Sequence, residues 1–292
     1  MSKLLVLIFI PFILSAQNTD FDRAVALYKA EQYQAAKPLF ESHLKVNSTS
    51  LQTVEYLGDI AASALDWNKA IDYYKILVEK HPNNANYNFK LGGTLGRKAQ
   101  NSNRFRAALL IGDIKKYLEK AAELDPSHRE VRWALVDLYI ALPSIIGGSE
   151  TTARKYANQL MKISELEGYL SLGNIAESFN NPQEAENYYK KALSLNAKNP
   201  KTNKQNNINY HLGKISGLYN IDLNSGLHYL NTFIQNHTIR DGVELKWAYY
   251  RKAQIYRHLG DKNQAQKWIS RAIASNEDFK EAHQEKEQIS RL

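Results

Sequence analysis

Small and apolar residues recur along this chain at helical spacing, in a pattern that repeats about every 34 residues. The repeat is clearest over residues 51–84, where Leu57 and Gly58 fall on one face of a predicted helix and Ala70 and Tyr74 begin the apolar face of a second. Since each helix has only one apolar face, the pattern predicts two helices packed face to face. Gly58 and Ala70 are small where the helices cross, so a larger side chain at either position would cost about 1 to 3 kcal/mol in overpacking.

Turn residues stand at the predicted helix ends. Asp66 is placed to cap the second helix of this pair, and Pro82 stands where that helix must end. Asn181 and Pro182 form a cap followed by a proline that suits the first helical position, and Ser149 can cap another helix. These local signals predict helices joined by short connections.

Helix pairs of this kind cannot bury their apolar faces alone, so several must stack. The predicted fold is all-α, an α-solenoid of about seven helix-turn-helix repeats that ends in a capping helix over 280–292. The repeats are expected at approximately 17–48, 51–84, 85–126, 129–164, 165–199, 206–239 and 246–279. The third closes about ten residues late, which predicts longer helices around 97–110, and the fourth contains a loop rich in proline and glycine over 142–149.

The chain resembles the tetratricopeptide repeat family over nearly all of the sequence after residue 16, through the spacing of Val54, Leu57, Gly58, Ala61, Ala70, Tyr74 and Pro82 and its recurrence. The third and fourth repeats also look like a variety found in exported bacterial repeat proteins. The resemblance implies a right-handed solenoid that serves as a helical scaffold, with protein or peptide as the partner. It brings no defined activity with it.

The family also implies which residues line the concave groove, because certain positions of each first helix point there. Transferred unit by unit, these positions give a candidate protein-binding set of rings between mixed charges, which suits an extended or helical peptide. The set is Phe21, Glu55, Asp59, Phe89, Trp133, Asp137, Asn174, Glu177, Tyr210, Lys214, Tyr250, Gln254 and Arg257. An alternative is that Trp133 and Tyr210 simply pack against the preceding repeat. The family's clamp for a C-terminal carboxylate is not matched, since the equivalent positions begin with Phe21, Val25, Glu55 and Asp59.

The formal net charge is +8, and the excess of basic residues is uneven. One basic patch falls in the third-repeat extension and comprises Arg97, Lys98, Arg104, Arg106, Lys115 and Lys116. A second basic group, in the last repeat, comprises Arg251, Lys252, Arg257, Lys262, Lys267 and Arg271. An alternative function is therefore a basic binder of an anionic envelope polymer or lipid, although such charges also occur on ordinary solvated helix faces.

The first residues are typical of a secretory signal. Lys3 precedes an apolar run over 4–14, and Ser15 and Ala16 offer a cleavage site, so residues 1–16 are predicted to be a signal peptide and the protein to be periplasmic or secreted. The run is short for a stable membrane span, which needs about 20 residues, although an uncleaved anchor is the alternative. The chain has no cysteine, which excludes disulfides and a lipid-modified cysteine.

No constellation of residues indicates catalysis. The eight histidines show no metal-ligand spacing, and Gly92 to Arg97 lacks the ending of a phosphate loop and follows no predicted strand. Neither a metal nor a cofactor is predicted, and nucleic acid is not expected as a partner because no recognition motif is present. The sequence therefore favours a non-catalytic exported scaffold.

Overall fold

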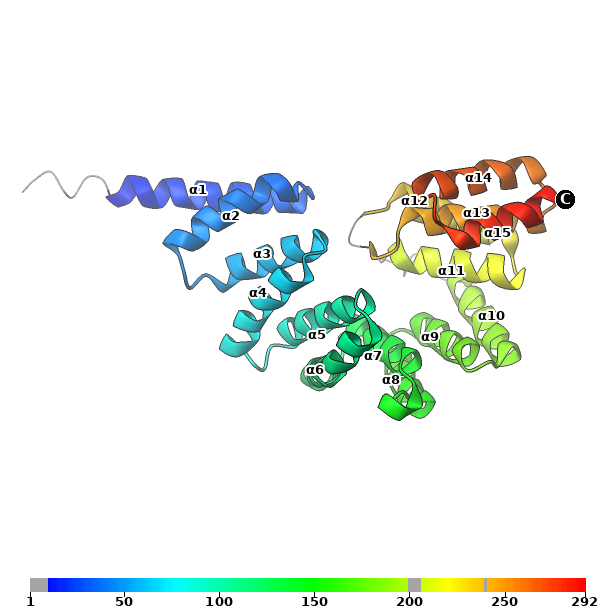
Figure 1. Cartoon of the computed structure of the whole chain (residues 1–292), viewed down its shortest axis with the longest axis horizontal. Coiled ribbons are helices and arrows are strands. Elements are labelled where there is room, and N and C mark those ends of the chain that lie inside the picture. Colours follow the sequence, from blue (N-terminus) through cyan, green and yellow to red (C-terminus); the bar gives the residue numbers. More distant parts are fainter. Residues whose placement is uncertain (1–9, 199–205, 239–240) are drawn as a thin grey trace, which may run out of the picture. The chain divides into compact units, whose positions relative to one another are not determined.

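The computed structural model describes residues 10–198, 206–238 and 241–292, and these residues form helices without any strand (Figure 1). Residues 1–9 of the predicted signal peptide lie outside the described residues. The helices are α1 (Ile10–Lys29), α2 (Tyr33–Val46), α3 (Leu51–Ser63), α4 (Trp67–Lys80), α5 (Ala85–Gln100), α6 (Arg104–Leu124), α7 (Arg129–Ala141), the short 3-10 helix η1 (Ser144–Ile146), α8 (Glu150–Ile163), α9 (Glu165–Ser178), α10 (Pro182–Lys198), α11 (Asn206–Tyr219), α12 (Leu223–Gln235), α13 (Leu245–His258), α14 (Lys262–Ser275) and α15 (Lys280–Ser290).

The chain divides into two compact units, Met1–Leu135 and Val136–Leu292. Within each unit, helices that follow one another in sequence pack side by side, as α3 does on α4 and α9 on α10. This is the architecture of stacked helix pairs that the sequence pattern predicts.

Close helix crossings in both units depend on glycine. A Cβ atom added to Gly58 of α3 would lie 2.6 Å from Cε1 of Tyr74 in α4, and one added to Gly173 of α9 would collide with the Tyr189 ring in α10. Both tyrosine rings are buried. The prediction that small residues stand where the helices cross is confirmed at these positions.

The predicted caps form. Asp66 accepts a hydrogen bond from the Lys69 amide at 3.2 Å at the start of α4, and Ser149 accepts one from the Thr152 amide at 3.1 Å at the start of α8. In the loop before α8, Gly147 has a positive φ of 91°, the left-handed region that favours glycine. These local bonds set where the helices begin.

The first unit has an aromatic core at its N-terminal end. Phe40 of α2 is fully buried, its ring stacks on Tyr56 at 4.7 Å between centroids, and Phe21 meets it edge-on at 5.9 Å. In the same unit α5 has 16 residues and α6 has 21, against 13 in α3 and 14 in α4. The expected lengthening of the third helix pair is therefore confirmed.

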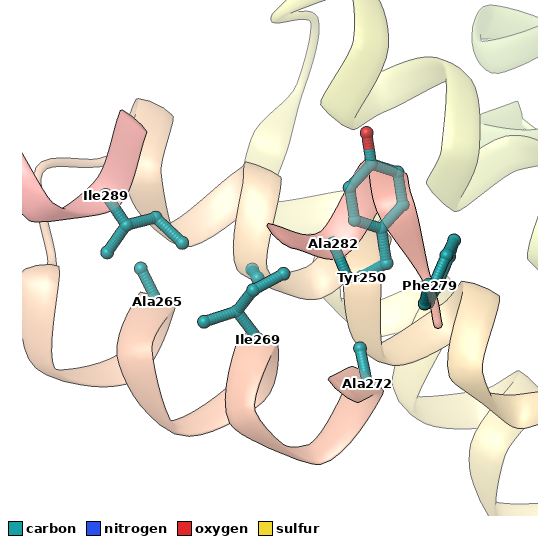
Figure 2. Packing of buried hydrophobic residues seen from close by; sticks show 8 residues of the cluster. Tyr250, Ala265, Ile269, Ala272, Phe279, Ala282 and Ile289 are labelled. Atoms are coloured by element: carbon teal, nitrogen blue, oxygen red, sulfur yellow. The ribbon is translucent and has the colours of Figure 1, made fainter. Parts of the chain in front are cut away.

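The second unit ends in a layer formed by α13, α14 and α15. Ala265, Ile269 and Ala272 of α14 face Ala282 and Ile289 of α15, with the Tyr250 ring of α13 beside them (Figure 2). All of these side chains are buried. The last helix therefore covers an apolar face of the preceding pair.

Candidate protein-binding surfaces

A network of ion pairs and hydrogen bonds links α1, α3 and α5, each of which is the first helix of its helix pair in the first unit. The Lys90 ammonium of α5 lies 2.6 Å from Glu55 Oε1 and 2.7 Å from Asp59 Oδ1, both carboxylates coming from α3. The hydroxyls of Tyr28 and Tyr74 donate to Asp59 at 2.8 and 2.7 Å. These contacts bring α1, α3, α4 and α5 together.

The two carboxylates of this network already have partners within the fold, since they share the Lys90 ammonium and accept further hydrogen bonds from neutral donors. Asn86 adds a further donor to Glu55 at 3.0 Å. Burial, and after it the Asp59 carboxylate, raises the pKa of Tyr74 well above its usual value, so its hydroxyl remains a donor to Asp59. Glu55 and Asp59, both predicted groove residues, therefore serve mainly to join neighbouring repeats in the first unit.

Three predicted aromatic groove positions in the first unit are only partly exposed. Phe21 packs in the aromatic core with Phe40 and His43, and the Phe89 ring lies 4.8 Å from the His128 ring. Trp133 of α7 is half-buried. Part of each ring is therefore accessible to a partner, which leaves their role in binding a prediction.

In the second unit, four predicted groove residues gather on α7, α9 and α11. Asn174 of α9 donates to Asp137 of α7 at 3.4 Å, and Glu177 of α9 accepts from the Tyr189 hydroxyl at 2.9 Å. Lys214 of α11 is close enough to Glu177 and Asp137 for both to act on its charge. The structure therefore places acidic, amide and basic side chains together here.

Lys214 and Arg251 form the least compensated part of this surface. Burial lowers the pKa of Lys214; Glu177 and Asp137 oppose this effect, whereas the neighbouring Arg251 cation adds to it. Within the described part of the chain, Lys214 forms no ion pair with any carboxylate, and the Nε of Arg251 is buried with no hydrogen-bond acceptor. Two cations thus lie close together without a carboxylate bound between them.

Arg251 was not among the predicted groove residues. Its guanidinium lies 4.8 Å from the centroid of the Tyr250 ring and donates to Gln254 Oε1 at 2.8 Å. It also interacts with Tyr210 and counteracts the rise that burial causes in the pKa of that hydroxyl. Lys90 follows the predicted groove residue Phe89, and Arg251 follows the equivalent Tyr250. A basic residue at the same position of two repeats was the signal in the sequence that could have identified both.

The expectation that Tyr210, Tyr250 and Gln254 present open surfaces is wrong. Their relative exposures are 7%, 9% and 8%. Tyr210 packs on Phe233 of α12, and Tyr250 on Phe279 at the start of α15. The rings cannot serve as wide platforms for a peptide because neighbouring helices cover them. Tyr210 packs within its own repeat and toward α13, and not on the preceding repeat as the alternative had it.

Arg257 is also used within the fold. Its Nε lies 2.5 Å from Oε1 of Glu285, a buried carboxylate of α15 that also accepts a long bond from Gln254 at 3.4 Å. This pair attaches the last helix to α13. Of the predicted groove residues in the second unit outside α7, Asn174, Glu177, Lys214 and Arg257 are half-exposed, and Arg257 is the one held in an ion pair with α15.

Three members of the second basic group lie around the ring of Trp268. Lys252 is buried, with its ammonium 3.3 Å from the centroid of the Trp268 ring and 2.6 Å from Asn231 Oδ1. Arg271 lies 4.8 Å and Lys267 5.9 Å from the centroid of the same ring. These contacts place three of the six cations of the second basic group around one tryptophan.

Replacing Lys252 by methionine should change how stability depends on pH. Burial, then Arg271 and Lys267, lowers the pKa of Lys252 from 10.5 to about 8. Between these two values the folded protein binds fewer protons than the unfolded chain, so the free energy of unfolding of the wild type should rise with pH, by up to about 1.4 kcal/mol per pH unit. We expect wild type to gain about 2 kcal/mol relative to Lys252→Met between pH 7 and pH 10, measured by urea denaturation.

The control for this prediction is Lys262→Met, because Lys262 bonds only to the Ser290 carbonyl near the chain end, at 2.9 Å. Its stability curve should run parallel to that of wild type. Parallel curves for Lys252→Met as well would show that Lys252 keeps an ordinary pKa.

Among the described residues, no group of three or more histidine, cysteine, aspartate or glutamate side chains is arranged to hold a metal ion. No helix within residues 10–198, 206–238 and 241–292 combines the length and apolar character needed to span a bilayer.

Family models for the tetratricopeptide repeat match three segments of the chain. One model matches residues 166–199 and 248–279, and a second matches 21–85. The structure is similar to that of a tetratricopeptide repeat protein from Parabacteroides merdae, with a TM-score of 0.60 and 10% identity over 94% of this chain and 99% of the other. It is also similar to a tetratricopeptide repeat protein from Thermus thermophilus, with a TM-score of 0.50 and 20% identity over 75% of this chain and 99% of the other.

Among characterised proteins, a stretch of 186 residues is 26% identical to mouse protein O-mannosyl-transferase TMTC3. The match covers 59% of this chain but only 19% of the transferase. The family models and the structural neighbours together support the tetratricopeptide repeat family, and the protein has the solenoid fold on which such proteins bind other proteins or peptides.

Proposed function

We propose that this protein is a non-catalytic scaffold, exported after removal of a signal peptide near Ala16, that binds an acidic segment of another protein. The contact surface is the face formed by Glu177 and Lys214 of α9 and α11 together with Arg251 of α13. Tetratricopeptide folds generally act as binding scaffolds, and the N-terminal sequence supports export. The periplasm or the cell exterior is the proposed location.

The observation that carries the proposal is the neighbouring cations Lys214 and Arg251, which no carboxylate of the described residues bridges, although Glu177 and Asp137 act on Lys214 from nearby. Two partly desolvated cations repel each other unless an anion lies between them. A carboxylate from a bound segment would supply that anion, and charged hydrogen bonds of this kind are strong because the donors are already positioned. In the first unit, by contrast, Lys90 is already paired with Glu55 and Asp59.

The test uses an array of short peptides of varied charge and the full chain. We expect acidic peptides to bind, and the double variant Lys214→Met, Arg251→Met to weaken binding at least about tenfold, since loss of partners for a desolvated carboxylate costs more than about 1.4 kcal/mol. Lys190→Met is the matched control, because Lys190 on α10 is paired with Glu186 at 2.6 Å. If the double variant binds the same peptides as tightly as wild type, this face is not the binding site.

A second candidate function is a basic binder of an anionic polymer or lipid through the third-repeat extension. The observation in its favour is the exposure of Arg97, Arg104, Arg106 and Lys116 in α5 and α6. Polyanion binding by this patch would fall steeply with ionic strength, because exposed charges are screened by salt. The double variant Lys214→Met, Arg251→Met of the protein would leave polyanion binding unchanged.

A further inference from the structure

The first turns of α6 expose two large apolar side chains. Phe105 is 88% exposed and Leu109 is 83% exposed, whereas most other large apolar residues of the first unit are buried or half-buried. The two positions are four residues apart and therefore lie next to each other on one face of the helix. They form a compact apolar pair at the projecting end of the third helix pair.

The fold does not use this face. Ile114, Leu118 and Ala121 are buried and define the core side of α6, and at about 100° per residue the pair Phe105 and Leu109 falls on the opposite side. Gly112 lies on the same exposed face one turn further along, and a Cβ atom there would meet nothing within 4 Å. Phe105 and Leu109, on this exposed face of α6, therefore do not contribute to the core.

Cations flank the apolar pair on both sides. Arg104 and Arg106 are exposed on either edge of the stripe, and Arg97 and Lys98 end α5 just across the turn at 101–103. From residue 97 to residue 118 the chain has six basic residues and one acidic residue, Asp113. An apolar face with basic edges is typical of helices that lie at the surface of an anionic bilayer.

We propose that this tip docks on an anionic lipid surface, with Phe105 and Leu109 entering the headgroup region and the arginines contacting the phosphates. A soluble polyanion would engage the cations only and would leave the apolar pair in water. A stable protein interface usually needs a larger patch, of about 800 Å² on each side, than two side chains at a helix tip provide. The lipid surface is therefore the one ligand that accounts for the apolar pair and the cations together. This narrows the second candidate function to one ligand and is independent of the peptide site on α11 and α13.

The test measures binding of the full chain to vesicles of phosphatidylcholine alone and of phosphatidylcholine mixed with phosphatidylglycerol. We expect binding only to the mixed vesicles. The double variant Phe105→Gln, Leu109→Gln should lower the partition coefficient about a hundredfold, tenfold for each apolar side chain lost, and Arg104→Gln, Arg106→Gln should lower it about thirtyfold. Both pairs are exposed, so circular dichroism should show an unchanged fold.

A second measurement follows insertion directly. Because the chain has no cysteine, Phe105→Cys can be labelled at a single site with an environment-sensitive fluorophore, whose emission should shift to the blue on mixed vesicles. The control is Ile145→Cys, since Ile145 is 91% exposed in a loop without charged residues. Its label should show no shift, and Ile145→Gln should bind vesicles as wild type does.

Three results would overturn the inference. The first is vesicle binding that does not depend on Phe105 and Leu109. The second is an equal shift at position 145, which would indicate general adhesion of exposed apolar residues. The third is binding to polyphosphate that is at least as tight as binding to the mixed vesicles, which would mean that the apolar pair adds nothing to the affinity for lipid. None of these would alter the peptide result at Lys214 and Arg251.

Discussion

Gly168→Ala should lower the free energy of unfolding of the second unit by about 3 kcal/mol, at the upper end of typical overpacking effects. Gly168 lies in α9, and a Cβ atom there would lie 2.5 Å from the Met161 Cα of α8. The obstacle is backbone, so no rotation of a side chain can relieve it. The two helices would have to separate, although alanine is by itself the better helix former.

The matched control is Gly93→Ala in the middle of α5, where a Cβ atom would meet nothing within 4 Å. This variant should be unchanged or more stable by up to about 1 kcal/mol. Because the chain has two compact units, its unfolding need not be a single transition, so hydrogen exchange of the α8 and α9 amides should accompany denaturation by urea. Equal stability of the two variants would mean that α8 and α9 are not in close contact.

The helices and their ends were predictable because the signals for them are local. The spacing of Leu57, Gly58 and Tyr74 predicts which faces of two successive helices pack together. The capping side chains of Asp66 and Ser149 each accept a hydrogen bond from an amide three residues further on. Local chemistry of this kind does not depend on the rest of the chain. Repetition of the pattern then predicted stacking, because one helix pair exposes too much apolar surface.

The candidate site was only partly predictable, because the same position in different repeats meets different neighbours. Phe89 and Tyr250 occupy equivalent places, yet the Tyr250 ring packs on Phe279, the residue that precedes α15, whereas the Phe89 ring packs on His128. Glu55 was expected to face a partner but pairs with Lys90 of the next repeat. Whether a charged groove residue is available to a partner depends on the side chains of the adjacent repeat. The periodicity of one repeat does not predict those contacts.

Deleting residues 280–292 should have the other large effect, a loss of about 4 kcal/mol in the second unit. The deletion removes Ile289, whose burial contributes about 1.5 to 3 kcal/mol, and exposes the faces of Ala265 and Ile269 that α15 covers (Figure 2). It also removes Glu285, which leaves Arg257 without its carboxylate. Breaking a buried ion pair by removing one partner costs about 3 to 5 kcal/mol, and we take less than this range because Arg257 is partly exposed to solvent.

A point variant separates docking of α15 from the presence of the chain. Ile289→Asp places a charge against Ala265 and Ile269, so α15 should detach, and protection of the α13 and α14 amides from hydrogen exchange should fall nearly as far as in the deleted chain. Glu287→Ala, at an exposed position on the same helix, should leave protection unchanged.

The last helix of a solenoid needs one apolar face and one polar face, and α15 has both. Ala282, Glu285 and Ile289 are buried, while its other side chains are exposed to water. Full protection of α13 and α14 after the deletion would show that the preceding helix pair closes the solenoid by itself.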